Sequence, residues 1–165
     1  MREQIAILVR LQAIDSDIQK IEKRLGKVGG EMTGLDQELK DFESALKEKL
    51  SIREEYQKRY RSLESDVNMN LPKITNSKGK LTSVKTNKEY QALLKEIEDL
   101  KTINSNLEDR MVEILEQGDA TEKQLHENKQ AFEAAEIRVA GEKAGIEKAA
   151  EEDRSRLAEL KADFQ

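Results

Sequence analysis

The chain has 165 residues, of which 38% are charged and 4% aromatic, and its net charge at pH 7 is −5. This composition is typical of long helices and argues against a compact globular core. The absence of cysteine excludes disulfides and thiolate metal sites. No apolar stretch approaches the ~20 residues that cross a membrane, so we expect a cytoplasmic protein with no membrane partner.

The first predicted element is a helix over about residues 3–67. From Leu11 to Val67, apolar residues recur at alternating steps of three and four, which is the heptad pattern of a coiled-coil seam. The two charged exceptions in this seam are Lys49 and Arg53. We expect them to form a polar layer, with Asn104 opposite Arg53, that sets the register of the coiled coil. The alternative is a ligand or partner site.

A basic connector is predicted next, over residues 68–86, because asparagine, proline and glycine accumulate there. Residues 67–88 contain no aspartate or glutamate and carry a charge of +5, which leaves −10 for the rest of the chain. Such a tip attracts acidic proteins or phosphate backbones, although solvated loop lysines are the alternative. Apolar Ile74, Leu81 and Val84 interleave with the basic residues. The candidate partner-binding residues are Lys73, Lys78, Lys80, Lys85 and Lys88.

A second helix is predicted over about residues 87–164, since Thr86 and Glu89 have the spacing of a capping box. We therefore expect an all-α fold, a long antiparallel two-helix coiled-coil hairpin that forms a single domain over residues 1–165. A turn near Lys78 and Gly79 makes the numbers of paired residues sum to 156 or 157. This register places Leu63 opposite Leu93, Tyr60 opposite Ile97, Tyr56 opposite Leu100, Leu25 opposite Phe132, Ile18 opposite Val139 and Leu11 opposite Ile146.

Glycines interrupt the first helix outside its seam, and each costs up to about 1 kcal/mol relative to alanine. The same register places Gly118 of the second helix opposite Leu39, close to this level. We therefore expect a bend here, either without functional consequence or acting as a hinge or partner contact. The glycines of the first helix are Gly26, Gly29, Gly30 and Gly34.

No pattern in the sequence indicates catalysis. The single histidine, His126, lies among charged residues, and no nucleophile motif, phosphate-binding loop or metal-ligand spacing is present. We expect a protein that is not an enzyme, with no catalytic, cofactor-binding or metal-binding residue. Three functions remain open: a regulatory adaptor that binds proteins, an RNA-binding protein that uses the basic tip, and a structural spacer. The chain is expected to be a monomer or a homodimer.

Two stretches of the sequence carry a resemblance to a known family. They are residues 8–15 (LVRLQAID) and residues 81–97 (LTSVKTNKEYQALLKEI). They resemble bacterial C4-type zinc-ribbon proteins with an N-terminal coiled-coil hairpin. The resemblance implies a protein-interaction hairpin linked to transcription or flagellar regulation, with a sigma factor, another transcription component or RNA as partner. The cysteines of the ribbon have no counterpart here, so the resemblance covers the hairpin alone and implies zinc only if a ribbon follows Gln165.

Overall fold

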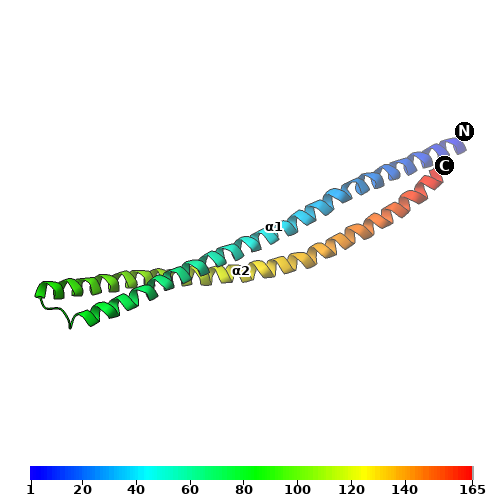
Figure 1. The fold of residues 1–165 in the computed structure, drawn as a ribbon. Helices are drawn as coiled ribbons and strands as arrows, with labels where there is room; N and C mark the ends of the chain where they lie inside the picture. The colour runs from blue at the N-terminus through cyan, green and yellow to red at the C-terminus, as the bar shows by residue number, and fades with distance from the viewer. Residues whose placement is uncertain (165) are drawn as a thin grey trace. The chain divides into compact units, whose positions relative to one another are not determined.

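The structure, a computed structural model, describes residues 1–164 and contains two long helices. Helix α1 spans Arg2–Lys80 and α2 spans Asn87–Phe164, and residues 81–86 connect them. The helices run antiparallel (Figure 1). The predicted all-α coiled-coil hairpin is therefore confirmed.

The chain divides into two compact units, each built from one part of α1 and one part of α2. Unit 1 comprises residues 1–45 and 129–164, and unit 2 comprises Leu46–Asn128. In both units the residues at three- and four-residue steps are buried or half-buried, and the residues between them are exposed. The narrow apolar seam that the heptads predict is therefore the core of each unit.

Helix α1 is longer than predicted, because it ends at Lys80 and not near Val67. Pro72 lies inside the helix on its exposed side, although proline normally costs a helix interior about 3 kcal/mol. The seam explains this continuation, since its spacing extends beyond Val67 and places Ile74 and Ser77 in buried positions. Burial of these residues against α2 outweighs the local preference of proline.

The predicted register is wrong. In unit 2, Arg53 pairs with Glu122, and Asn104 bonds to Asn70 instead of lying opposite Arg53. In unit 1, Arg24 pairs with Asp153. The numbers of these partners sum to between 174 and 177, so each predicted partner on α2 is displaced by about 18–20 residues.

The displacement has two causes. The turn lies at residues 81–86 and not at Lys78 and Gly79. The start of α2 also extends beyond the end of α1 (Figure 1). Since Asn70 pairs with Asn104, Lys80 lies opposite about residue 94, and the first turns of α2 have no partner on α1. In consequence Tyr56 and Tyr60 share a groove with Ile114 and Gly118, and not with Leu100 and Ile97.

A polar pair interrupts the seam of unit 2. The side chain of Asn104 is 5% exposed, and its Oδ1 accepts a hydrogen bond of 2.8 Å from Asn70 Nδ2. Asn104 Nδ2 in turn donates to the carbonyl oxygen of Val67 at 3.4 Å. A buried asparagine pair in a coiled coil favours the one register in which both side chains are bonded. This pair is therefore the register-setting layer that was expected from Lys49 and Arg53.

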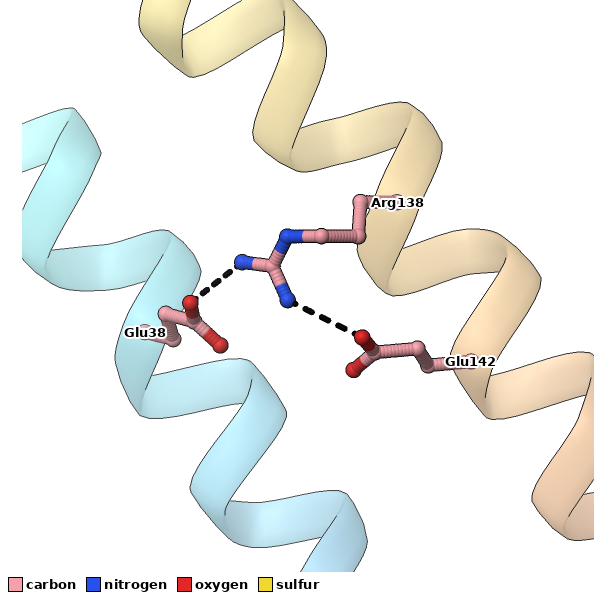
Figure 2. Close-up of polar contacts among 3 residues, drawn as sticks. All are labelled: Glu38, Arg138 and Glu142. Carbon is pink, nitrogen blue, oxygen red and sulfur yellow. Dashed lines mark hydrogen bonds and ion pairs between the residues drawn. The ribbon is translucent and has the colours of Figure 1, made fainter.

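Ion pairs flank the seam of unit 1. The Arg24 guanidinium makes two parallel hydrogen bonds to Asp153, of 3.1 and 2.9 Å. Arg138 reaches Glu38 on the opposite helix and Glu142 on its own helix (Figure 2). Hydrogen bonds to Glu38 and then to Glu142 raise the pKa of Arg138 above its usual value. The pairs are solvent-accessible, so they fix alignment more than they add stability.

The glycines are not arranged as expected. Gly118 lies in unit 2, where it lines a groove with Tyr56, so it is not the partner of Leu39. The contact of Lys143 with Asp36 and the register of unit 1 place Gly30 and Gly34 near the level of two glycines of α2. These glycines are Gly141 and Gly145. The bend itself stays a prediction.

Candidate partner-binding site

The predicted site residues lie together at the closed end of unit 2. We call this region the lysine tip, defined by Lys73, Lys78 and Lys80 on α1, Lys85 in the connector and Lys88 in the first turn of α2. The larger part of the expected loop is helical, so four of the five lysines project from a helix and only Lys85 lies in the connector.

The connector is held by short-range hydrogen bonds. The amides of Leu81 and Ser83 donate to the carbonyl oxygens of Lys78 and Lys80, at 3.3 and 3.0 Å. Thr82 Oγ1 donates to the Gly79 carbonyl oxygen at 3.0 Å. These bonds satisfy carbonyl groups that the end of α1 leaves without helical partners. No residue described in the connector has a positive φ, so the turn requires no special glycine.

Of the capping box predicted from the sequence, the half made by the Thr86 side chain is present at the start of α2. Thr86 Oγ1 accepts a hydrogen bond of 3.2 Å from the amide of Glu89, and the Thr86 carbonyl oxygen accepts one of 3.1 Å from Tyr90. An N-cap of this kind typically contributes about 1 kcal/mol to helix stability. It matters here because the first turns of α2 lie beyond the end of α1. The cap positions Lys88 and Tyr90.

All five lysines of the tip are exposed. None of them forms an ion pair or a side-chain hydrogen bond with any residue in 1–164. Elsewhere in the chain, cations such as Arg24, Arg138 and Lys143 contact carboxylates. The tip is therefore a cluster of positive charge that the described chain leaves unneutralised.

The apolar residues expected to share the contact surface turn inward. Ile74 is buried, and Leu81 and Val84 are half-buried, so all three pack inside the tip. The exposed apolar side chains near the lysines are others, with exposed fractions from 38% to 61%. They are Met69, Leu71, Tyr90 and Leu94.

Sequence reasoning missed this second set for an identifiable reason. Met69 and Leu71 fall within residues 68–86, which the sequence predicts as an irregular connector. The signal that identifies them is helical spacing. Met69 and Lys73 share one face of α1, and Tyr90 and Leu94 share one face of α2, because residues four apart are neighbours on a helix.

The polar layer predicted at Lys49 and Arg53 has a different composition. Both side chains are half-buried, and Arg53 Nη1 lies 3.3 Å from Glu122 Oε1 of α2. The Nε of Arg53 is buried and has no hydrogen-bond partner within residues 1–164. The Arg53 guanidinium is therefore bonded through Nη1, while its Nε has no acceptor.

Other kinds of site find little support in residues 1–164. No group of three or more histidine, cysteine, aspartate or glutamate side chains converges there as a metal site would require. Neither α1 nor α2, as far as they are described, has a stretch long and apolar enough to cross a membrane.

Comparisons with known proteins agree with this architecture. The chain resembles the 2.12 Å resolution structure of CT398 from Chlamydia trachomatis, with a TM-score of 0.84 over 99% of this chain and 70% of that one. The two sequences are 15% identical, so the likeness concerns the fold. No curated protein matches the sequence. The CT398-like coiled coil hairpin domain matches residues 11–164. The chain therefore belongs to the CT398-like coiled-coil hairpin family.

Proposed function

We propose that the chain is a non-enzymatic adaptor that binds an acidic segment of a partner protein through the lysine tip. The observation that carries this proposal is the set of five exposed lysines without carboxylate partners among residues 1–164, in a chain of net charge −5. Positive charge concentrated at one end of an acidic molecule steers an acidic partner to that end.

A protein partner suits the tip better than RNA. Residues 67–88 contain no arginine, and Tyr90 is the aromatic residue nearest the lysines. Single-stranded nucleic acids bind through stacking on several aromatic or arginine side chains. The exposed aliphatic side chains of Met69, Leu71 and Leu94 are instead typical of the apolar part of a protein interface. We therefore expect an amphipathic acidic segment as the ligand.

The biological setting follows from the resemblance of residues 8–15 and 81–97 to zinc-ribbon hairpin proteins. On this basis we place the protein in the bacterial cytoplasm, in transcription or flagellar regulation, with a sigma factor or another transcription component as partner. The residues present do not fit a zinc ion, because the chain has no cysteine and residues 1–164 contain no converging set of ligands. No step of the proposed function uses a metal.

The test compares two charge-matched variants of the full chain by fluorescence anisotropy. The first carries Lys78→Glu, Lys80→Glu and Lys85→Glu. The control changes three exposed lysines outside the tip, none with an ion pair to residues 1–164. The control substitutions are K20E, K101E and K129E.

The probe is a labelled peptide with glutamate and leucine at helical spacing, and an RNA strand of equal charge is measured in parallel. We expect the tip variant to bind the peptide at least about tenfold more weakly than the wild type, and the control to bind it normally. Equal losses in both variants, or none in either, would overturn the proposal. Tighter binding of RNA with a steep salt dependence would replace it with an RNA-binding function. If neither probe binds, the hairpin is a structural spacer.

A further inference from the structure

Unit 2 contains a groove of about 480 Å³. Its lining residues come from segments 53–61 and 114–122, which include none of the lysines of the tip. Gly118 occupies a seam position of α2, between Ile114 and Thr121, and has no side chain to fill it. A Cβ atom added at Gly118 would have no neighbour within 4 Å. The groove is therefore a gap in the seam. It is lined in part by Tyr56, Tyr60, Ile114, Leu115 and Gly118.

Two arginines stand at this gap. Arg53 uses one nitrogen for Glu122 at 3.3 Å, while its buried Nε has no hydrogen-bond partner among the described residues. Arg61 Nε donates to the Gln57 carbonyl oxygen at 3.3 Å, and the guanidinium has no ion pair within residues 1–164. A buried N–H without an acceptor lowers stability. A ligand that offers an acceptor to this N–H therefore forms a hydrogen bond that the unbound protein lacks, and this bond favours binding.

The groove as a whole is not strongly cationic. Asp119 and Glu122 also line it, so the charges of Arg53 and Arg61 are balanced. A simple anion therefore gains little from entering. The apolar part of the lining, with two tyrosine rings and a half-exposed Leu115, provides the larger contact area for a ligand. The site requires both a ring and an acceptor on the same molecule.

We propose that this groove binds an aromatic side chain of a partner peptide together with an adjacent carboxylate. The ring lies between Tyr56 and Tyr60 against Leu115, in the space that Gly118 leaves open. The carboxylate enters the gap and accepts hydrogen bonds from the edge of the Arg53 guanidinium that carries the unpartnered Nε. Arginine and carboxylate match in a planar, two-bond geometry. This site is separate from the lysine tip, and its existence does not depend on what the tip binds.

The probe is N-acetyl-phenylalanine, and its amide, which lacks the carboxylate, is the control ligand. Binding to the full-length ¹⁵N-labelled chain is followed by NMR, through the Arg53 Nε–H resonance and the backbone amide of Tyr56. The Arg53 resonance is assigned from Arg53→Lys. We expect the acid to shift both resonances and to bind about tenfold more tightly than the amide, as one charge-assisted contact allows.

Two variants test the position of the ligand. Gly118→Leu fills the gap and is expected to abolish the shifts while raising the unfolding midpoint, because it adds a seam side chain and removes a helical glycine. Gly26→Leu makes the same change at an exposed position of α1 and is expected to leave binding unchanged. Arg53→Lys retains the charge but loses Nε, and should remove the preference for the acid.

Equal binding of acid and amide would overturn the assignment of the carboxylate to Arg53. Binding that survives Gly118→Leu would overturn the assignment to this groove. Absence of any shift at millimolar probe would refute the site altogether. None of these results bears on the lysine tip, whose own probe is the acidic peptide.

Discussion

Substitutions in the pair of buried Asn104 and half-buried Asn70 are expected to change stability in opposite directions when one residue or both residues are replaced. Asn104→Ala removes the 2.8 Å bond from Asn70 and the 3.4 Å bond to the Val67 carbonyl oxygen. It also leaves the half-buried amide of Asn70 without its acceptor. One lost bond is worth about 1 kcal/mol and one unsatisfied buried group about 1–3 kcal/mol. We expect unit 2 to lose about 2–3 kcal/mol.

The double substitution Asn70→Leu and Asn104→Leu should act in the opposite direction. When both members of a hydrogen-bonded pair become apolar, no polar group is left unsatisfied, and the exchange itself is nearly neutral. Each leucine then adds apolar burial worth about 1.5 kcal/mol when it is well packed. Because a seam position is only partly covered, we expect a net gain of about 2 kcal/mol over the wild type.

Urea denaturation followed by circular dichroism measures both effects, as changes of midpoint at constant slope. Spin labels at the exposed positions Leu71 and Ile103 provide the control, since their separation should be the same in every variant if the register is retained. A double variant less stable than the wild type would refute the reasoning. A harmless Asn104→Ala would refute it equally, because it would mean that the pair is not desolvated.

Two further predictions concern an ion pair between the helices of unit 1 and the cap of α2. Hydrogen bonds from Arg24 lower the pKa of Asp153, so the pair stabilises unit 1 above about pH 4 and loses its effect as the pH falls through the folded-state pKa. Asp153→Asn should therefore flatten the decline of the urea midpoint below about pH 4, and an unaltered profile would contradict this. Thr86→Ala removes the acceptor of the Glu89 amide and should cost about 1 kcal/mol, with faster hydrogen exchange at Glu89; unchanged exchange would show that the cap is dispensable.

The fold could be predicted from the sequence because the heptad seam is a repeated signal. Each element contributes many equivalent positions, so a few exceptions such as Lys49 do not obscure the pattern. The start of α2 was equally accessible, since Thr86 and Glu89 satisfy a local rule that needs no knowledge of the rest of the chain.

The register could not be predicted by the same means. It depends on the end of α1, and there the local signal of Pro72 and the periodic signal of Ile74 and Ser77 disagree. The periodic signal prevails because it reports burial, and burial is decided by the opposite helix. The extra turns of α2 beyond Lys80 depend on the conformation of the connector, which heptad spacing does not describe.

The lysine tip was likewise predictable only in part. Its charge is visible in the composition, and the positions of the five lysines at one end follow from any hairpin. Which apolar residues share a face with the lysines depends on helical spacing. Because Met69 was predicted to lie in a loop, this spacing could not be applied to it. The groove at Gly118 was out of reach for a similar reason, because a missing side chain becomes a cavity only when its partners Tyr56 and Tyr60 are known.

The four glycines near one level of unit 1 bear on how cooperatively that unit unfolds. In an ordinary helix, order spreads along the backbone, since each residue added fixes one more hydrogen bond. Gly30 and Gly34 weaken this propagation in α1, and Gly141 and Gly145 weaken it at about the same height in α2. Coupling across this zone then depends on seam side chains such as Met32 and Ile146. Opening of unit 1 is therefore expected to begin in its interior as readily as by fraying from the chain ends.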